Sequence, residues 1–149
     1  MVEMNIRLMR IDDYEQVYEL WMSCAGMGLN NLDDSKEGIV KFLKRNPDTC
    51  FVADVENVIV GAILVGNDGR RGYIYHTAVN PQYRNQGIAK NLVDTSVTAL
   101  QKIGINKAAL VAFDRNEAGN DFWDKMGFTV RNDLVYRNKA LSEMVRRDT

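Results

Sequence analysis

The stretch from Val79 to Ala89 combines the residue types that a protein needs to hold a phosphate group. A strand ends there, a short loop follows, and a helix is expected to start near Gln86. The N–H groups of a first helical turn are unpaired, and the helix dipole favours an anion beside them. Gly87 leaves the backbone open to a ligand, and Arg84 adds a positive charge. The sequence therefore predicts a pyrophosphate-binding loop made of Arg84, Asn85, Gln86, Gly87, Ile88 and Ala89.

Side chains that could act on a proton precede this loop. Tyr73, Tyr75, His76 and Thr77 lie on an expected strand from Gly72 to Val79. Successive strand residues point to opposite faces, so His76 is expected on the face opposite to the other three, unless a β-bulge re-aims it. His76 is the only histidine, and histidine ordinarily changes its charge near neutral pH. It is a candidate base, and a packed or surface position without chemistry is the alternative.

The elements around these residues predict an α/β protein. Asn5 to Met9 is expected to form a strand, and Asp12 is expected to cap the helix that follows, with Glu15 completing a capping box. A second helix is expected from Asp33–Ser35 to the stop at Asn46-Pro47. Three strands joined by short turns then form an expected antiparallel meander: Thr49 to Val55, Val58 to Val65 and Gly72 to Val79.

The pattern changes after this meander. The expected order is a long helix that stops at Gly104, a strand, a shorter helix and a last strand. The last three span Ala108 to Phe113, Asn116 to Met126 and Phe128 to Tyr136. A strand, a long helix and a second strand imply a right-handed crossover and a parallel pair. The prediction is a layered α/β fold, also describable as α+β, with a mixed, mostly antiparallel sheet and about four flanking helices.

The segment around Gly87 resembles the Q/R-x-x-G-x-G/A signature of the GNAT (Gcn5-related N-acetyltransferase) superfamily, here filled by Arg84, Gly87 and Ala89. Downstream, Asn116 and the run from Trp123 to Phe128 are similar to the family's Asn and Tyr-x-x-x-Gly-Phe pattern. The similarity covers nearly the whole chain and looks like the bacterial ribosomal-protein alanine acetyltransferase branch. It implies transfer of an acetyl group from acetyl-CoA to an amine.

The resemblance also implies how acetyl-CoA is held. The strands before and after the long helix are expected to splay, with the pantetheine arm against backbone groups of Thr77 and Val79. Asn116 is expected to contact the pantetheine, and it also suits a helix N-cap. Trp123 stands where the family often has a Tyr that protonates the leaving thiolate. Because an indole N–H cannot act as that acid, Trp123 is expected to pack on the cofactor or the core.

The base is less defined, since the family's usual Glu positions hold Tyr73, Tyr75 and Val111 here. Tyr75, which could order a water, and His76 are the two candidate catalytic residues. The resemblance implies an acceptor pocket lined by the first helices and the last strand: Trp21, Met22, Tyr73 and Tyr136.

A weak base favours an amine of low pKa. A peptide α-amine, with a pKa near ~8, is about one-tenth neutral at pH 7, and a lysine amine, near ~10.4, is neutral less than once in about a thousand. A protein N-terminus or a small amine is therefore the expected partner. The alternative is a GNAT-fold protein that binds acyl-CoA with weak or no catalysis. A nucleotide-binding module of another family is disfavoured because no Walker lysine follows the glycine.

Composition narrows the remaining choices. The 149 residues are expected to form a single domain, and a net charge of −1 gives no general affinity for nucleic acid or an anionic membrane. No apolar run approaches the ~20 residues of a membrane span. Cys24 and Cys50 have no metal-type spacing, which indicates reduced thiols, a cytoplasmic location and no metal site. A homodimer is possible.

Overall fold

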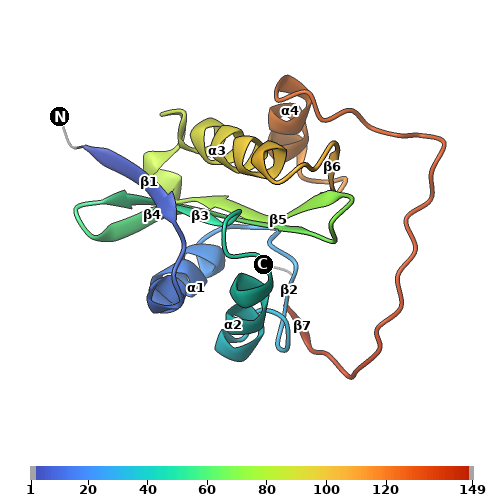
Figure 1. The fold of residues 1–149 in the computed structure, drawn as a ribbon, viewed down its shortest axis with the longest axis horizontal. Helices are drawn as coiled ribbons and strands as arrows, with labels where there is room; N and C mark the ends of the chain where they lie inside the picture. Colours follow the sequence, from blue (N-terminus) through green and yellow to red (C-terminus); the bar gives the residue numbers. More distant parts are fainter. Residues whose placement is uncertain (1–2, 148–149) are drawn as a thin grey trace.

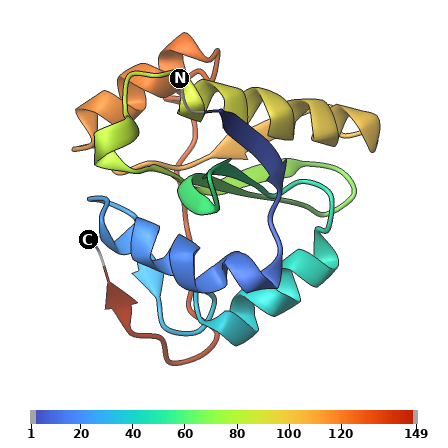
Figure 2. The ribbon, with the colours of Figure 1, turned by 90° about the vertical axis from the view of Figure 1, so that its left-hand side faces the viewer.

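A central five-stranded sheet carries helices on both faces. The computed structural model describes residues 3–147 (Figure 1). Helices α1 and α2 cover one face of the sheet and α3 and α4 cover the other, as the two perpendicular views show (Figure 2). The elements in chain order are β1 (Met4–Leu8), η1 (Ile11–Asp13), α1 (Tyr14–Met22), β2 (Leu29–Asn30), α2 (Lys36–Arg45), β3 (Phe51–Val55), β4 (Val58–Asn67), β5 (Gly72–Val79), η2 (Pro81–Tyr83), α3 (Ile88–Lys102), β6 (Ala108–Leu110), α4 (Glu117–Lys125) and β7 (Arg146–Arg147).

The sheet has the order β1-β3-β4-β5-β6. The first four strands are antiparallel to their neighbours, and β5 and β6 are parallel. Helix α3 is the crossover between those two strands. The predicted mixed sheet, with its meander and its parallel pair, is confirmed.

Strand β4 is the centre of two cores, because both of its faces are buried. Toward α1 and α2, Ala62 and Leu64 pack in one cluster with Val17 and Trp21 of α1. Toward α3, a second cluster contains Val60, Ile63 and Val65 of β4 and Ile88, Leu92, Val93 and Leu100 of α3. Apolar residues recur at helical spacing in both helices, at Val17 and Trp21 in α1 and at Ile88 and Leu92 in α3, and these are the faces that are buried.

Two predicted helix starts differ in detail. The side chain that organises the start of η1 and α1 is Asp13, whereas Asp12 is exposed. The Asp13 carboxylate accepts the N–H of Arg10 at 2.8 Å and forms an ion pair with Arg7 at 2.8 Å, which anchors it to β1. Helix α3 starts at Ile88, with Gly87 as N-cap, and not near Gln86.

The predicted strand from Phe128 to Tyr136 is wrong. Residues 128–145 form no helix or strand; they leave α4, stand out from the body as an arc, and return to β2 (Figure 1). Strand β6 has only three paired residues, so its free edge is too short to pair with a strand of nine residues from Phe128 to Tyr136. The last strand is β7, which pairs with β2.

Candidate active site

The parallel strands β5 and β6 separate where the sequence predicted a gap. Their pairing runs from Gly72 with Ala108 to Ile74 with Leu110 and then stops. Strand β5 continues to Val79, paired with β4 alone over that second half. One backbone edge of residues 75–79 is therefore open toward the end of β6, and a ligand with amide groups could pair with it.

A cavity of about 1410 Å³ surrounds this gap. It extends from the loop before α3, along β5, to the loop between α1 and α2. Thirteen of the predicted site residues line it: Tyr73, Tyr75, His76, Thr77, Val79, Arg84, Asn85, Gly87, Ile88, Ala89, Asn116, Trp123 and Tyr136. Three do not, since Gln86 and Met22 lie outside its lining and Trp21 is fully buried in the core.

The loop before α3 has the backbone that an anion site requires. Asn85 and Gly87 have left-handed φ angles of 64° and 78°, which turn the chain sharply into the helix. The first helical bond runs from Asn91 N–H to the Gly87 carbonyl oxygen at 3.0 Å. The N–H groups of the preceding residues thus have no acceptor within the helix, and no acidic residue lies in its first turn.

A β-bulge on β5 corrects the predicted direction of His76. Between the pairs Ile63–Thr77 and Val65–Ile74, two residues of β5 face the single Leu64 of β4. Tyr75 and His76 therefore point to the same face: Tyr75 contacts Phe42 of α2 at 5.5 Å and His76 contacts Trp21 of α1 at 5.0 Å, measured between ring centroids. The predicted alternation of side-chain directions along β5 fails here, because the bulge adds one residue to β5 between its paired positions.

Thr77 moves to the opposite face as a result of the same bulge. Its hydroxyl Oγ1 is buried and has no hydrogen-bond partner among residues 3–147. It pairs across the sheet with Ile63, whose side chain packs against α3. The prediction that Thr77 shares a face with Tyr73 and Tyr75 is therefore wrong.

His76 is held by an acidic partner that the sequence reasoning did not assign to it. Nε2 of His76 lies 2.7 Å from Oδ1 of Asp34, and their side chains are only 14% and 6% exposed. Oδ2 of Asp34 accepts the N–H of Asn30 at 2.8 Å, and its carbonyl oxygen accepts the hydroxyl of Tyr14 at 2.7 Å. An ionised carboxylate only accepts hydrogen bonds, so we assign the ring proton to Nε2. Nδ1 then carries the free lone pair.

Comparison with known proteins agrees with this geometry. Residues 14–128 match the Acetyltransferase (GNAT) family. The chain belongs to this family. An acetyltransferase of Sodalis glossinidius (strain morsitans) is 34% identical over 140 residues, which cover 94% of this chain and 97% of the relative. An acetyltransferase of Photorhabdus laumondii is 35% identical over 129 residues, covering 87% and 89% of the two chains.

Solved structures share the fold of this GNAT protein. The PaiA N-acetyltransferase of Thermoplasma acidophilum in complex with coenzyme A has a TM-score of 0.75 at 18% identity, covering 97% of both chains. The ribosomal-protein-alanine N-acetyltransferase of Brucella melitensis has a TM-score of 0.70 at 22% identity, covering 93% of this chain and 99% of that one. The predicted family, the acetyltransferase activity and acetyl-CoA as cosubstrate are thereby confirmed.

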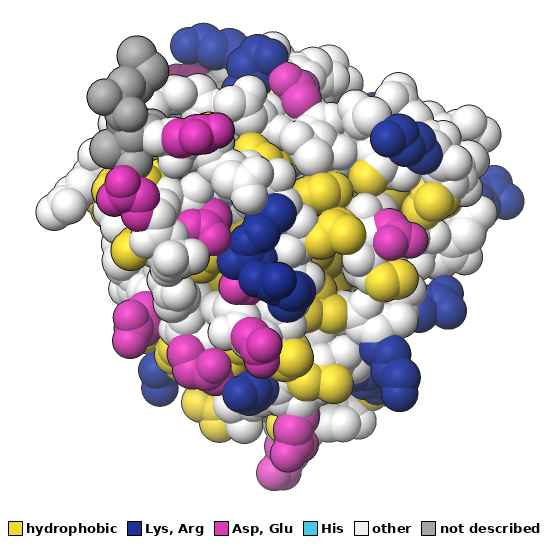
Figure 3. All heavy atoms as spheres, turned by 60° about the vertical axis from the view of Figure 1, so that its left-hand side comes forward, with side chains coloured by type: hydrophobic (Ala, Val, Ile, Leu, Met, Phe, Trp, Pro, Cys, Tyr) yellow, Lys and Arg dark blue, Asp and Glu magenta, His cyan; other side chains and the backbone are white. Residues whose placement is uncertain are grey.

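The GNAT cofactor fits the residues present. A Cβ built on Gly87 would meet nothing within 4 Å, so the space in front of the loop is free. The left-hand side of Figure 1, which holds the edge strand β1, carries Lys and Arg among Asp and Glu side chains, beside a band of hydrophobic side chains (Figure 3). The positive charge at the loop itself comes from Arg84, which lines the cavity, and from the N–H groups at the start of α3.

The residues of α4 divide between structure and cavity. Asn116 is the N-cap of α4, and its Oδ1 accepts the N–H of Gly119 at 3.0 Å, while the residue also lines the cavity. The Trp123 ring lies edge-on against Phe122 at 5.0 Å and against Phe128 at 5.3 Å. Trp123 is thus part of an aromatic cluster on the wall of the cavity.

Two tyrosines form the wall beside His76. The rings of Tyr73 and Tyr75 lie 4.6 Å apart. Burial raises the pKa of both hydroxyls above the ordinary tyrosine value, and the negative charge of Asp33 also raises the pKa of Tyr75. Both side chains are therefore neutral hydrogen-bond donors near pH 7. The charge of Tyr136 affects the pKa of both, which places it beside them.

Sequence reasoning also missed how the cavity is closed. The ring of Phe113 lies 3.6 Å from the Cβ position of Gly26 and 3.7 Å from that of Gly28, both with left-handed φ angles. The loop after α1 therefore crosses over the chain that leaves β6. Larger side chains there would separate the two loops, and the paired glycines were the available signal.

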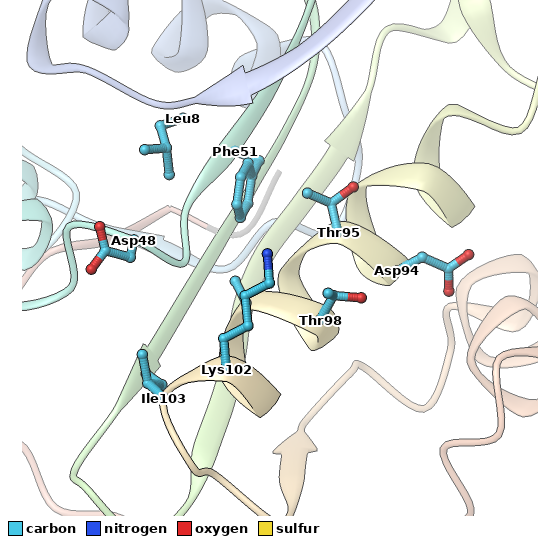
Figure 4. A pocket seen from close by; sticks show the side chains of 9 residues that line it. Leu8, Asp48, Phe51, Asp94, Thr95, Thr98, Lys102 and Ile103 are labelled. Atoms are coloured by element: carbon cyan, nitrogen blue, oxygen red, sulfur yellow. The ribbon is translucent and has the colours of Figure 1, made fainter.

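A second hollow, of about 610 Å³, lies away from this site, between β1, β3 and the last turns of α3 (Figure 4). Leu8, Phe51, Thr98 and Lys102 line it, and none of the predicted site residues reaches it.

Among residues 3–147, no group of His, Cys, Asp and Glu could hold a metal ion. Within the same range, no helix is long and apolar enough to cross a membrane.

Proposed function

We propose that this GNAT protein acetylates the α-amine of a peptide or a similar amine of low pKa, with His76 as the base. The observation that carries the proposal is the pair formed by His76 and Asp34. Nε2 and Oδ1 lie 2.7 Å apart, and both residues line the same cavity as the predicted cofactor loop. A base so placed needs no metal. The alternative, a protein that binds acyl-CoA with weak or no catalysis, rested on Trp123 and Val111, and the bulge adds His76 to the side chains on the cavity wall as a candidate base.

Each part of the site has a role in this proposal. Arg84 and the N–H groups from Gly87 to Ala89 bind the pyrophosphate. The open backbone edge of Thr77 and Val79 pairs with the amides of the pantetheine. Nδ1 of His76 takes a proton from the amine as its nitrogen attacks the thioester carbonyl, and the C–S bond then breaks to release CoA as the thiolate. Asp34 holds the ring and stabilises the imidazolium that forms.

The acceptor class follows from the fraction of the amine that is neutral and can attack. An amine of pKa near ~8 is about one-tenth neutral at pH 7, and one near ~10.4 is neutral less than once in about a thousand. The aromatic wall of Tyr73, Tyr75 and Tyr136 suits a peptide, which offers apolar and backbone groups together. The fold shared with a ribosomal-protein-alanine N-acetyltransferase supports a protein N-terminus.

Two peptides of equal length test the proposal. One has a free α-amine and no lysine, and the other has a blocked N-terminus and one internal lysine. Release of CoA thiol from acetyl-CoA is followed at pH 7.5. The free α-amine should be acetylated at least about tenfold faster, given the difference in the neutral fraction. Equal rates would reject the acceptor class, and no transfer to either would reject the proposed activity.

The remaining expectations are also proposals. We place the protein in the cytoplasm because Cys24 and Cys50 are both buried and form no disulfide with each other. We treat residues 1–149 as one functional domain. A homodimer, common in similar proteins, stays a prediction that light scattering of the purified protein can test.

A further inference from the structure

We propose that the acceptor carries a carboxylate about two to three residues from its reacting amine, and that Lys41 and Arg45 of α2 bind it. This inference rests on the proposed function, because it names the part of the acceptor that extends beyond His76. It predicts a preference for peptides with Asp or Glu near the N-terminus.

The two cations lie on the side of α2 that faces the cavity. Gly38, Lys41, Phe42 and Arg45 all line it, at the spacing of one helix face. Phe42 fixes the orientation of this face, because its ring packs edge-on against Tyr75 at 5.5 Å. Lys41 and Arg45 thus belong to the same wall as the tyrosines beside His76.

Some charged side chains of this wall have an ion-pair partner, and others have none. Among residues 3–147, Lys41 and Arg45 have no ion-pair partner, whereas Lys36 on the same helix pairs with Glu15 at 3.2 Å. Of the two acidic residues before α2, Asp34 pairs with His76, whereas Asp33 accepts only the neutral side-chain amide of Asn30 at 3.1 Å and keeps its negative charge. The two unpaired cations of α2 outnumber this one charge, so an anionic group is the complement of the wall.

The helix also sets the reach of the acceptor. Asp34, which marks the position of His76, comes directly before Ser35, the N-cap of α2. At a rise of about 1.5 Å per residue, Lys41 lies roughly 10 Å along the axis from that pair and Arg45 roughly 16 Å. An extended peptide covers about 3.3 Å per residue, and long basic side chains reach back several ångströms. A carboxylate on the third or fourth residue fits this distance.

The test uses three peptides that differ only at the third residue, which is Asp, Asn or Lys. We expect kcat/KM for the Asp peptide to exceed that for the Asn peptide about fivefold to tenfold at low salt, and the Lys peptide to be slowest. In the double variant K41A/R45A, the rates with the Asp and Asn peptides should become equal. Lys44→Ala is the matched control: Lys44 is on the same helix but does not line the cavity, and the preference should remain.

Binding keeps this test separate from turnover. Calorimetry of the CoA-loaded protein with the Asp and Asn peptides should show the same preference, again lost in K41A/R45A. Such binding without acetyl transfer would support the acceptor wall and reject only the proposed activity. Equal affinity for the two peptides, or a preference that survives in K41A/R45A, would overturn the inference.

Discussion

The two sides of β5 build their parts of the site in different ways. On the cofactor side, Arg84 to Ala89 follow one another in the chain, and the binding groups are mainly backbone N–H groups at the start of α3. On the acceptor side, the groups are side chains from separate elements. His76 comes from β5, Asp34 from the loop before α2, and Lys41 from α2 itself.

The two kinds of site respond differently to substitution. A backbone cradle depends on conformation, so many side chains are compatible with it provided that the left-handed turn at Gly87 forms. A side-chain site changes its chemistry with one substitution. Under the proposed function, we therefore expect substitutions on the acceptor side to change which amine reacts more than substitutions in the cofactor loop do.

The strongest test of the acceptor side is His76→Gln. Loss of a general base costs typically about 10²–10⁴-fold, so kcat should fall at least a hundredfold. The affinity for CoA should not change, because His76 bonds to Asp34 and packs against Trp21, and among residues 3–147 no hydrogen bond joins it to the loop from Arg84 to Ala89. The measurements are acetyl transfer to a free-amine peptide and calorimetric binding of CoA.

Asp34→Asn provides the matched comparison for His76→Gln. If the amide oxygen keeps the N–H of Asn30, the amide NH2 faces Nε2 of His76, and the ring proton must move to Nδ1, the nitrogen that acts as the base. We expect a loss in kcat close to that of His76→Gln, with partial recovery in Asp34→Glu, which keeps two carboxylate oxygens. A loss below threefold in His76→Gln would remove His76 from the chemistry and return it to a packing role against Trp21.

The cofactor side is tested by Gly87→Val against Gly104→Val. Both glycines have left-handed φ angles, 78° and 83°, and neither has an atom within 4 Å of its Cβ position. Both variants should thus lose similar stability, about 1–2 kcal/mol. Only Gly87→Val should weaken CoA binding, about tenfold or more, because its branches would enter the anion site. Equal CoA affinity in the two variants would place the pyrophosphate elsewhere.

The contrast between the sides also explains what the sequence could predict. The loop at Gly87 could be predicted because its geometry depends on consecutive residues and on the start of one helix. The His76–Asp34 pair could not, since the partners are 42 residues apart and meet only through a bulge in the ladder. A bulge depends on the register between two strands, which alternation along one strand does not contain.

The C-terminal segment shows the same limit. Phe128 to Tyr136 has the composition of a strand, and the resemblance to the family supported one. A strand also needs a partner edge, and β6 offers three paired residues. By contrast, the buried faces of α1 and α3 were predictable, because helical spacing of apolar residues is a local property.

Tyr75→Phe should have a moderate effect on the acceptor side. Because burial and Asp33 raise the pKa of the Tyr75 hydroxyl, the group stays protonated from pH 6 to 9 and its donor role is constant there. We expect kcat to fall about threefold, the size of one exposed hydrogen bond. The ratio of the two rates should not vary across this range. A ratio that changes with pH would mean that Tyr75 titrates during the reaction.

The smallest effect is expected at Trp123, where the family often has an acid. Three aromatic rings fix this position, since Trp123 packs against Phe122 at 5.0 Å and against Phe128 at 5.3 Å. A Tyr in this cluster would replace part of the indole contact, and its hydroxyl would have to reach about 2.6–3.2 Å from its partner to act as an acid. We therefore expect kcat of Trp123→Tyr to stay within about threefold of the original protein, because the wall was shaped around an indole.

Trp123→Phe is the matched variant, because Tyr and Phe differ only by the hydroxyl and share any packing loss. The rates of both are measured with one acceptor from pH 6 to 9, and their ratio isolates the acid. A phenol donates only below its pKa, ordinarily ~10, so a true acid effect must fade as the pH approaches that value. A tenfold advantage of Tyr over Phe with this fading would show that thiolate release limits the reaction. The cofactor side would then also use a side chain in the reaction, and it would no longer differ from the acceptor side by relying mainly on backbone groups.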